Sequence, residues 1–111
     1  MTTMKYENWD EVYELSFVRA LYSNNALAIK VMCKEDEVIV PFATLTINLI
    51  GISNNLDENC AIINIDECKE IIKHLAKEGV AEYIGHSVKL GFCSYPCYRF
   101  SKEWLKSLDS M

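Results

Sequence analysis

Cysteine and histidine are the residues of this chain best suited to chemistry, and four of them could form a zinc site. Cys93 and Cys97 are four residues apart, and His86 and Cys60 could supply the other ligands. Pro96 lies between the two cysteines and breaks any helix that would stack them, and the sequence has no second tight cysteine pair. We therefore interpret the cysteines as small buried thiols and expect no metal.

The same residue types could form a thiol catalyst, in which a histidine activates a cysteine. His74 falls on an expected helix, where it fits a half-exposed position, whereas His86 lies in a glycine-flanked segment and stays open as a base. The five cysteines are odd in number and follow no signal peptide, so we expect reduced thiols. Because no phosphate loop, dinucleotide fingerprint or nucleophile elbow is present, we expect no catalytic residue and no cofactor.

Aromatic residues near the C-terminus form a third kind of candidate site, a surface for a protein partner. The cluster comprises Phe92, Tyr95, Tyr98, Phe100 and Trp104, together with Arg99. Tyrosine and arginine often anchor protein interfaces, because they offer a large rigid area with a polar tip. Alternate members of a strand must face the core, so part of the cluster is structural. Tyr95, Tyr98 and Arg99 are the members that we select as binding candidates.

Acidic residues form the fourth candidate, in a chain whose net charge is −5. Nucleic-acid binding requires clustered basic residues, and the only arginines are Arg19 and Arg99, so we expect no direct contact with nucleic acid. The run Glu35, Asp36 and Glu37 could attract a basic protein, although acidic turns are also common as solubility devices.

The N-terminal half has the two-residue period of β-strands. Residues 12–22 alternate, with Tyr13, Leu15, Phe17 and Leu21 on one side, and an Asn-rich turn at 23–25 leads into a second strand over 27–34. After the acidic run we expect one strand over 38–49, which Pro41 places at an edge or beside a bulge. Thr44 and Thr46 lie on its polar face and complete the binding candidates.

The C-terminal half mixes helix and strand. Residues 51–59 predict an exposed loop and residues 60–65 a short strand, after which Asp66 would cap a helix over 67–78 that Gly79 ends. Residues 80–83 and 85–90 are ambiguous between loop and strand, and residues 95–100 predict a last strand. Ser101 would cap a short final helix with Trp104, Leu105 and Leu108 on one packed face.

These elements predict an α+β fold: a mainly antiparallel sheet of four to five strands, one covering helix and a short C-terminal helix. Residues 1–111 are expected to form a single domain, frayed only over residues 1–5. No stretch reaches the roughly 18 apolar residues that cross a bilayer, so we expect a cytoplasmic protein without membrane contact.

Three stretches resemble the bacterial family called domain of unknown function 4313: residues 22–25 (YSNN), 41–49 (PFATLTINL) and 91–100 (GFCSYPCYRF). The resemblance extends from about residue 13 to residue 108. The chain departs from the family pattern at Cys97, where leucine is usual, and at residues 88–90, which are less polar than usual. Both departures weaken the zinc interpretation.

The resemblance implies a gene of phages, plasmids and integrative conjugative elements, without a known activity or known site residues. Small acidic proteins of such elements often bind a host or defence protein, for example as anti-CRISPR or anti-restriction inhibitors. Our first hypothesis is therefore a non-enzymatic protein-binding module whose partner is a nucleic-acid-handling protein. The alternatives are a small thiol- or metal-dependent enzyme using Cys93, Cys97 and His86, or a self-assembling protein such as a homodimer.

Overall fold

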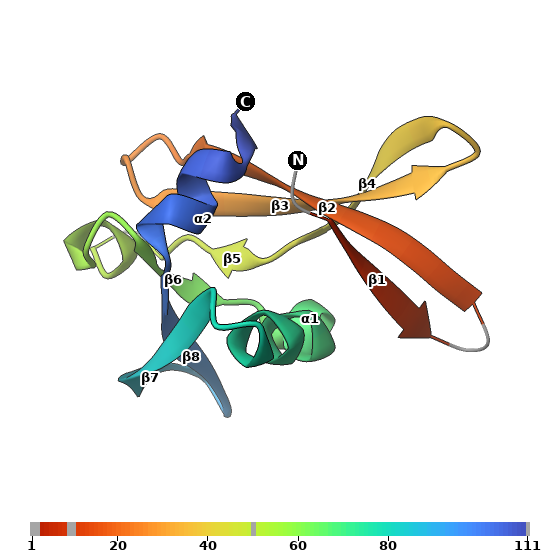
Figure 1. The fold of residues 1–111 in the computed structure, drawn as a ribbon. Helices are drawn as coiled ribbons and strands as arrows, with labels where there is room; N and C mark the ends of the chain where they lie inside the picture. The colour runs from red at the N-terminus through yellow and green to blue at the C-terminus, as the bar shows by residue number, and fades with distance from the viewer. Residues whose placement is uncertain (1–2, 9–10, 50, 111) are drawn as a thin grey trace.

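The structure is a computed structural model that describes residues 3–8, 11–49 and 51–110. Its class is α+β, as predicted, but the strands divide between two sheets (Figure 1). The first sheet has the order β1-β2-β3-β4, with β9 added beside β2. Its strands are β1 (Thr3–Asn8), β2 (Glu11–Leu21), β3 (Leu27–Glu35), β4 (Val38–Thr44) and β9 (Asp109–Ser110).

The second sheet is smaller and has the order β5-β6-β8-β7. Its strands are β5 (Thr46–Ile47), β6 (Cys60–Ile63), β7 (Ala81–Leu90) and β8 (Cys93–Phe100). The remaining elements are the short 3-10 helix η1 (Ser53–Asn55) and the helices α1 (Ile65–Lys77) and α2 (Lys102–Ser107). All strand pairs are antiparallel except β2 with β9, which is parallel.

One hydrophobic core joins the two sheets and the two helices. Alternate residues of β3 are buried, as the sequence period predicted, and the apolar side of α1 packs with them through Ile71, Ile72 and Leu75. Trp104 of α2 stacks on Phe100, with ring centroids 5.7 Å apart. The predicted packed face of the final helix is confirmed, since Trp104, Leu105 and Leu108 are all buried.

The predicted turns and helix ends are mostly correct. Asn25 adopts a positive φ of 67° in the turn between β2 and β3, and the Ser101 hydroxyl caps α2 by accepting a hydrogen bond from the Trp104 N–H at 3.3 Å. The predicted cap of the longer helix is wrong, because α1 begins at Ile65 with Asn64 in the cap position. Within the part of the chain that is described, neither helix is long and apolar enough to cross a membrane.

Two strand predictions need correction. Residues 3–5 are not frayed but belong to β1, which pairs with β2 from Thr3 opposite Ser16 to Asn8 opposite Glu11. This polar segment lacks the apolar alternation that marks a strand in sequence. It is a strand because its backbone pairs with that of β2. The single strand expected over residues 38–49 is broken at Leu45, where the chain leaves the first sheet and enters the second.

Candidate functional site

The acidic turn, which comprises Glu35, Asp36 and Glu37, lies at the far end of the β3–β4 hairpin. Glu35 pairs with Val38, and the two residues between them have positive φ angles, 45° at Asp36 and 72° at Glu37. Two successive positive φ angles are the backbone pattern of the tight hairpin turns that suit twisted strands. All three acidic side chains are exposed, and Figure 1 shows the tip of the β3–β4 hairpin projecting past α1.

Apolar side chains lie directly beside the acidic turn. Val38 is 60% exposed, Ile39 is 50% exposed and Phe42 is 38% exposed. β4 is an edge strand, so its outer side is open. The acidic turn with Val38, Ile39 and Phe42, which we call the hairpin end, therefore places a negatively charged turn next to an apolar centre formed by these three side chains.

A β-bulge beside Pro41 sets the position of Phe42. Val31 lies opposite Ala43 and Met32 lies opposite Pro41, so Phe42 is the extra residue of β4. Both parts of the prediction for Pro41 are confirmed, since the strand is at an edge and is bulged. The Phe42 ring packs against Tyr13 with a centroid distance of 5.8 Å. The ring contact orders Phe42 while leaving part of it accessible.

The apolar part of the hairpin end was not predicted from the sequence. Residues 38–42 form the apolar run VIVPF, which lacks the two-residue period that the rest of the hairpin shows. Such a run is typical of a strand that is buried on both faces, so the exposure of Val38 and Ile39 follows from the edge position of β4 and not from the run itself.

Thr44 and Thr46 do not form an exposed polar face, and this prediction is wrong. Thr46 is only 3% exposed, and its hydroxyl accepts a hydrogen bond from the Ile29 N–H at 3.2 Å and bonds the Tyr22 hydroxyl at 3.0 Å. The carbonyl of half-buried Thr44 accepts hydrogen bonds from Asn64 at 3.2 Å and from the Cys68 thiol at 3.6 Å. Thr46 therefore links the two sheets internally, and the carbonyl of Thr44 links β4 to the start of α1.

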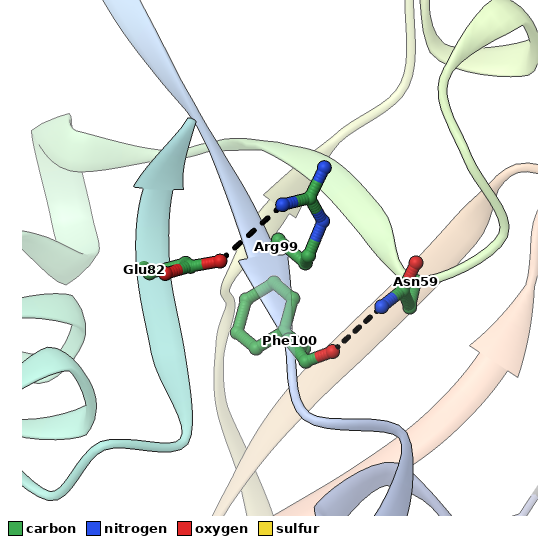
Figure 2. A network of polar contacts seen from close by, with 4 residues as sticks. All are labelled: Asn59, Glu82, Arg99 and Phe100. Atoms are coloured by element: carbon green, nitrogen blue, oxygen red, sulfur yellow. Dashed lines mark hydrogen bonds and ion pairs between the residues drawn. The ribbon is translucent and has the colours of Figure 1, made fainter. Parts of the chain in front are cut away.

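Tyr95, Tyr98 and Arg99 lie on β8 of the second sheet, away from the acidic turn on the first. Each has a partner within the chain. The Tyr98 ring is 5.9 Å from the ring of Tyr83, and Figure 2 shows Arg99 turned toward Glu82 of β7, at 3.3 Å. Nearby, the Asn59 side chain donates a hydrogen bond to the Phe100 carbonyl at 2.9 Å, which fixes the end of β8 to the loop before β6 (Figure 2).

The Tyr95 hydroxyl donates a hydrogen bond to the Asp66 carboxylate at 2.6 Å. This bond holds the proton on the phenol and raises the pKa of Tyr95 to about 12. The contact ties β8 to the start of α1. The structure therefore does not bring the predicted binding residues together. The acidic turn lies at one end of the first sheet, the two threonines lie inside the molecule, and the three residues of β8 lie on the second sheet.

The thiols and imidazoles are dispersed. Cys93 is exposed at the start of β8, whereas Cys97 is buried, so the two thiols face different surroundings. Residues 3–8, 11–49 and 51–110 contain no group of three or more potential metal ligands. His74 lies 3.7 Å from Glu78 on α1, and His86 is exposed on β7.

Burial controls the acidity of four thiols. It raises the pKa of Cys33 and Cys97, and it raises that of Cys68 to about 11. Burial also raises the pKa of Cys60, and the opposing effect of the neighbouring Arg99 does not overcome it. Such thiols remain protonated at neutral pH, which disfavours nucleophilic or metal-binding chemistry at these positions.

Comparison with known proteins identifies the family to which the chain belongs. Residues 17–111 match the model of the family described as domain of unknown function (DUF4313). The match covers most of the chain, so the chain belongs to this family, as the three sequence stretches indicated. No curated protein matches the chain. No solved structure matches it either.

Proposed function

We propose that this member of the DUF4313 family is a non-enzymatic protein-binding module, and that the hairpin end is its binding surface. The observation that carries the proposal is the exposure of Val38 and Ile39 directly beside the acidic turn. An apolar centre with a polar rim is the usual composition of a protein interface. A projecting hairpin also presents this centre without rearrangement of the core.

The chemistry of the hairpin end indicates a basic partner. Glu35, Asp36 and Glu37 place three carboxylates next to the apolar centre, and a chain of net charge −5 attracts positively charged surfaces during encounter. A positively charged surface is typical of proteins that handle nucleic acid. The proposed partner is therefore a nucleic-acid-handling protein, while the module itself does not bind nucleic acid.

The proposed biological setting is the one that the resemblance of the sequence to the DUF4313 family implies. The module is a single cytoplasmic domain encoded by a mobile genetic element, and it acts on a host or defence protein in the manner of an anti-CRISPR or anti-restriction inhibitor. Occupying the basic groove of such a protein would block its access to nucleic acid. The hairpin end is small, so the proposal concerns a local block and not full imitation of DNA.

The test is a quantitative pull-down of the tagged chain from a host lysate that contains defence systems, with and without nuclease, followed by mass spectrometry. Wild type is compared with a hairpin variant, Glu35→Gln, Asp36→Asn and Glu37→Gln, which removes charge with little change in shape. The matched control replaces three exposed acids of the α1 region, Glu67, Glu70 and Glu78, by Gln and removes the same number of charges.

We expect wild type and control to recover one basic protein, and the hairpin variant to lose it. Equal recovery by the hairpin variant would contradict the proposed surface. Recovery that disappears when nuclease is added would show a bridge through nucleic acid and would contradict direct binding. Recovery of the chain alone in all samples would favour self-assembly.

A further inference from the structure

A cavity of about 660 Å³ opens at the other end of the first sheet, where β2 ends and β3 begins. Helix α2 and the loop before β6 form its other walls through Leu105, Lys106 and Glu58. The volume is within the range of pockets that hold small ligands. Leu27 at the cavity and Glu35 at the acidic turn are the two ends of β3, about 26 Å apart at the usual rise of a strand. The cavity is therefore separate from the hairpin end.

Basic side chains converge on this cavity in a chain that is acidic as a whole. Arg19, Lys102 and Lys106 line it, and among the described residues of its lining the only acid is Glu58. Lys102 lies 3.3 Å from Glu58, whereas the Arg19 guanidinium has a neutral partner, donating to the Ser110 hydroxyl at 3.2 Å. The cavity consequently has an excess of positive charge.

The elements explain why these cations meet. Lys102 and Lys106 are four residues apart on α2 and so lie on the same side of the helix. The pairing of Arg19 with Ser110 between β2 and β9 brings the chain after α2 beside the end of β2. Sequence analysis did not find this site, because Arg19 is far from the two lysines along the chain.

The rest of the lining is aliphatic apart from the polar residues Asn59 and Ser110. Leu21, Leu27 and Leu105 contribute to it together with Ala20, and no aromatic residue is among the described residues that line it. Leu21 was expected on the buried side of its strand, but it is 65% exposed at the cavity. Leu21 is therefore the exposed aliphatic side chain of the lining, since Leu27 and Leu105 are buried. An exposed leucine beside unneutralised cations provides favourable contacts for both parts of an amphiphilic anion.

We propose that this cavity binds a small aliphatic oxyanion, an organic phosphate or carboxylate whose charged group contacts Arg19 and Lys106 and whose aliphatic part lies on Leu21. Guanidinium groups recognise phosphate and carboxylate through two parallel hydrogen bonds, which assigns the orienting role to Arg19. Lys106 supplies a second positive charge. This site is independent of the proposed protein-binding function.

The test is isothermal titration calorimetry of the full chain with four probes: hexyl phosphate, hexanoate, inorganic phosphate and hexanol. Hexyl phosphate and hexanoate differ in the charged group and so identify the preferred oxyanion. Inorganic phosphate lacks the aliphatic part, and hexanol lacks the charge. We expect binding of at least one amphiphilic anion that is tighter than binding of either partial probe and that weakens with added salt.

The variant Lys106→Gln removes an exposed charge, and Lys69→Gln on α1 is the matched control. We expect Lys106→Gln to weaken the preferred anion roughly tenfold or more and Lys69→Gln to leave it unchanged. Circular dichroism of both variants verifies the fold. Absence of binding by both amphiphilic anions, or equal affinity in Lys106→Gln, would overturn the proposal. Self-association of wild type that Lys106→Gln abolishes would also overturn it, by assigning the cavity to the acidic turn of a second copy.

Discussion

The Thr46 hydroxyl accepts a hydrogen bond from the Ile29 N–H at 3.2 Å and so closes the gap where the chain passes between the two sheets. β4 ends at Thr44, and the Leu45 N–H donates to the Ile29 carbonyl at 2.9 Å as the last backbone contact with β3. β4 has ended at this point, so its backbone provides no acceptor for the buried Ile29 N–H. The Thr46 hydroxyl provides that acceptor instead.

Thr46→Val is expected to lower the free energy of unfolding by about 1–3 kcal/mol, because the shape is kept while the buried Ile29 N–H loses its acceptor. Thr46→Ser keeps the hydroxyl and should cost only about 0.8 kcal/mol for the lost methyl group. Urea denaturation of both variants measures the difference. Equal stability of the two variants would show that the hydroxyl is unimportant.

This contact illustrates which parts of the structure the sequence could predict. The alternation of residues 42–49 correctly indicates extended chain, and the polarity of Thr46 suggests an outward position. The structure buries Thr46 instead, because Ile29 and Tyr22 provide hydrogen-bond partners from other parts of the chain. Local periodicity describes the faces of a strand, but it contains no information on where a strand changes sheet.

The candidate sites could be predicted from the sequence only where their residues are neighbours along the chain. The acidic turn could be found because its residues are consecutive and too polar to bury. Arg19 and Lys106 could not be found as neighbours, because only the pairing of β9 with β2 and the placement of α2 bring them to one cavity. The exposure of Ile39 depends on the edge position of β4, which is a property of the sheet.

Tyr95 should be among the last tyrosines to ionise. Its hydrogen bond to Asp66 raises its pKa from an ordinary value of about 10 to about 12, so the folded chain keeps this proton while the unfolded chain loses it. The contribution to stability is present below the ordinary pKa and is lost as pH rises from about 10 to about 12.

Ultraviolet titration of the phenolates measures this effect. We expect the late component of the wild-type titration to disappear in Tyr95→Phe and to move to lower pH in Asp66→Asn, since the acceptor loses its charge. Tyr83→Phe is the control, because it removes a different exposed tyrosine. A late component that survives in Tyr95→Phe would exclude this assignment.

Cys93 should react with a thiol reagent much faster than the other four cysteines under native conditions. It is exposed, whereas the other four are buried and have raised pKa values. Titration with a disulfide reagent at neutral pH should give one fast thiol, which Cys93→Ser removes. Exposure alone explains such a result, so a fast Cys93 would not by itself indicate an enzyme. A second fast thiol in Cys93→Ser would contradict the burial of the other cysteines.

Ile39→Ser separates the proposed binding role of the hairpin end from its contribution to stability. The side chain is half exposed on an edge strand, so its replacement should change the free energy of unfolding by no more than about 0.5 kcal/mol. An apolar residue at the centre of an interface commonly contributes more than about 1 kcal/mol to binding. Recovery of the partner should therefore fall at least fivefold, measured by quantitative pull-down.

Leu90→Ser is the matched control, because Leu90 is also an exposed apolar strand residue, at 39%, but lies on β7 of the second sheet. We expect the control to keep both its stability and its partner. Loss of binding in both variants would indicate a general effect of surface hydrophobicity, and retained binding in Ile39→Ser would remove the apolar centre from the interface. Only the combination of unchanged stability and lost binding at Ile39 supports a surface that is apolar because a partner covers it.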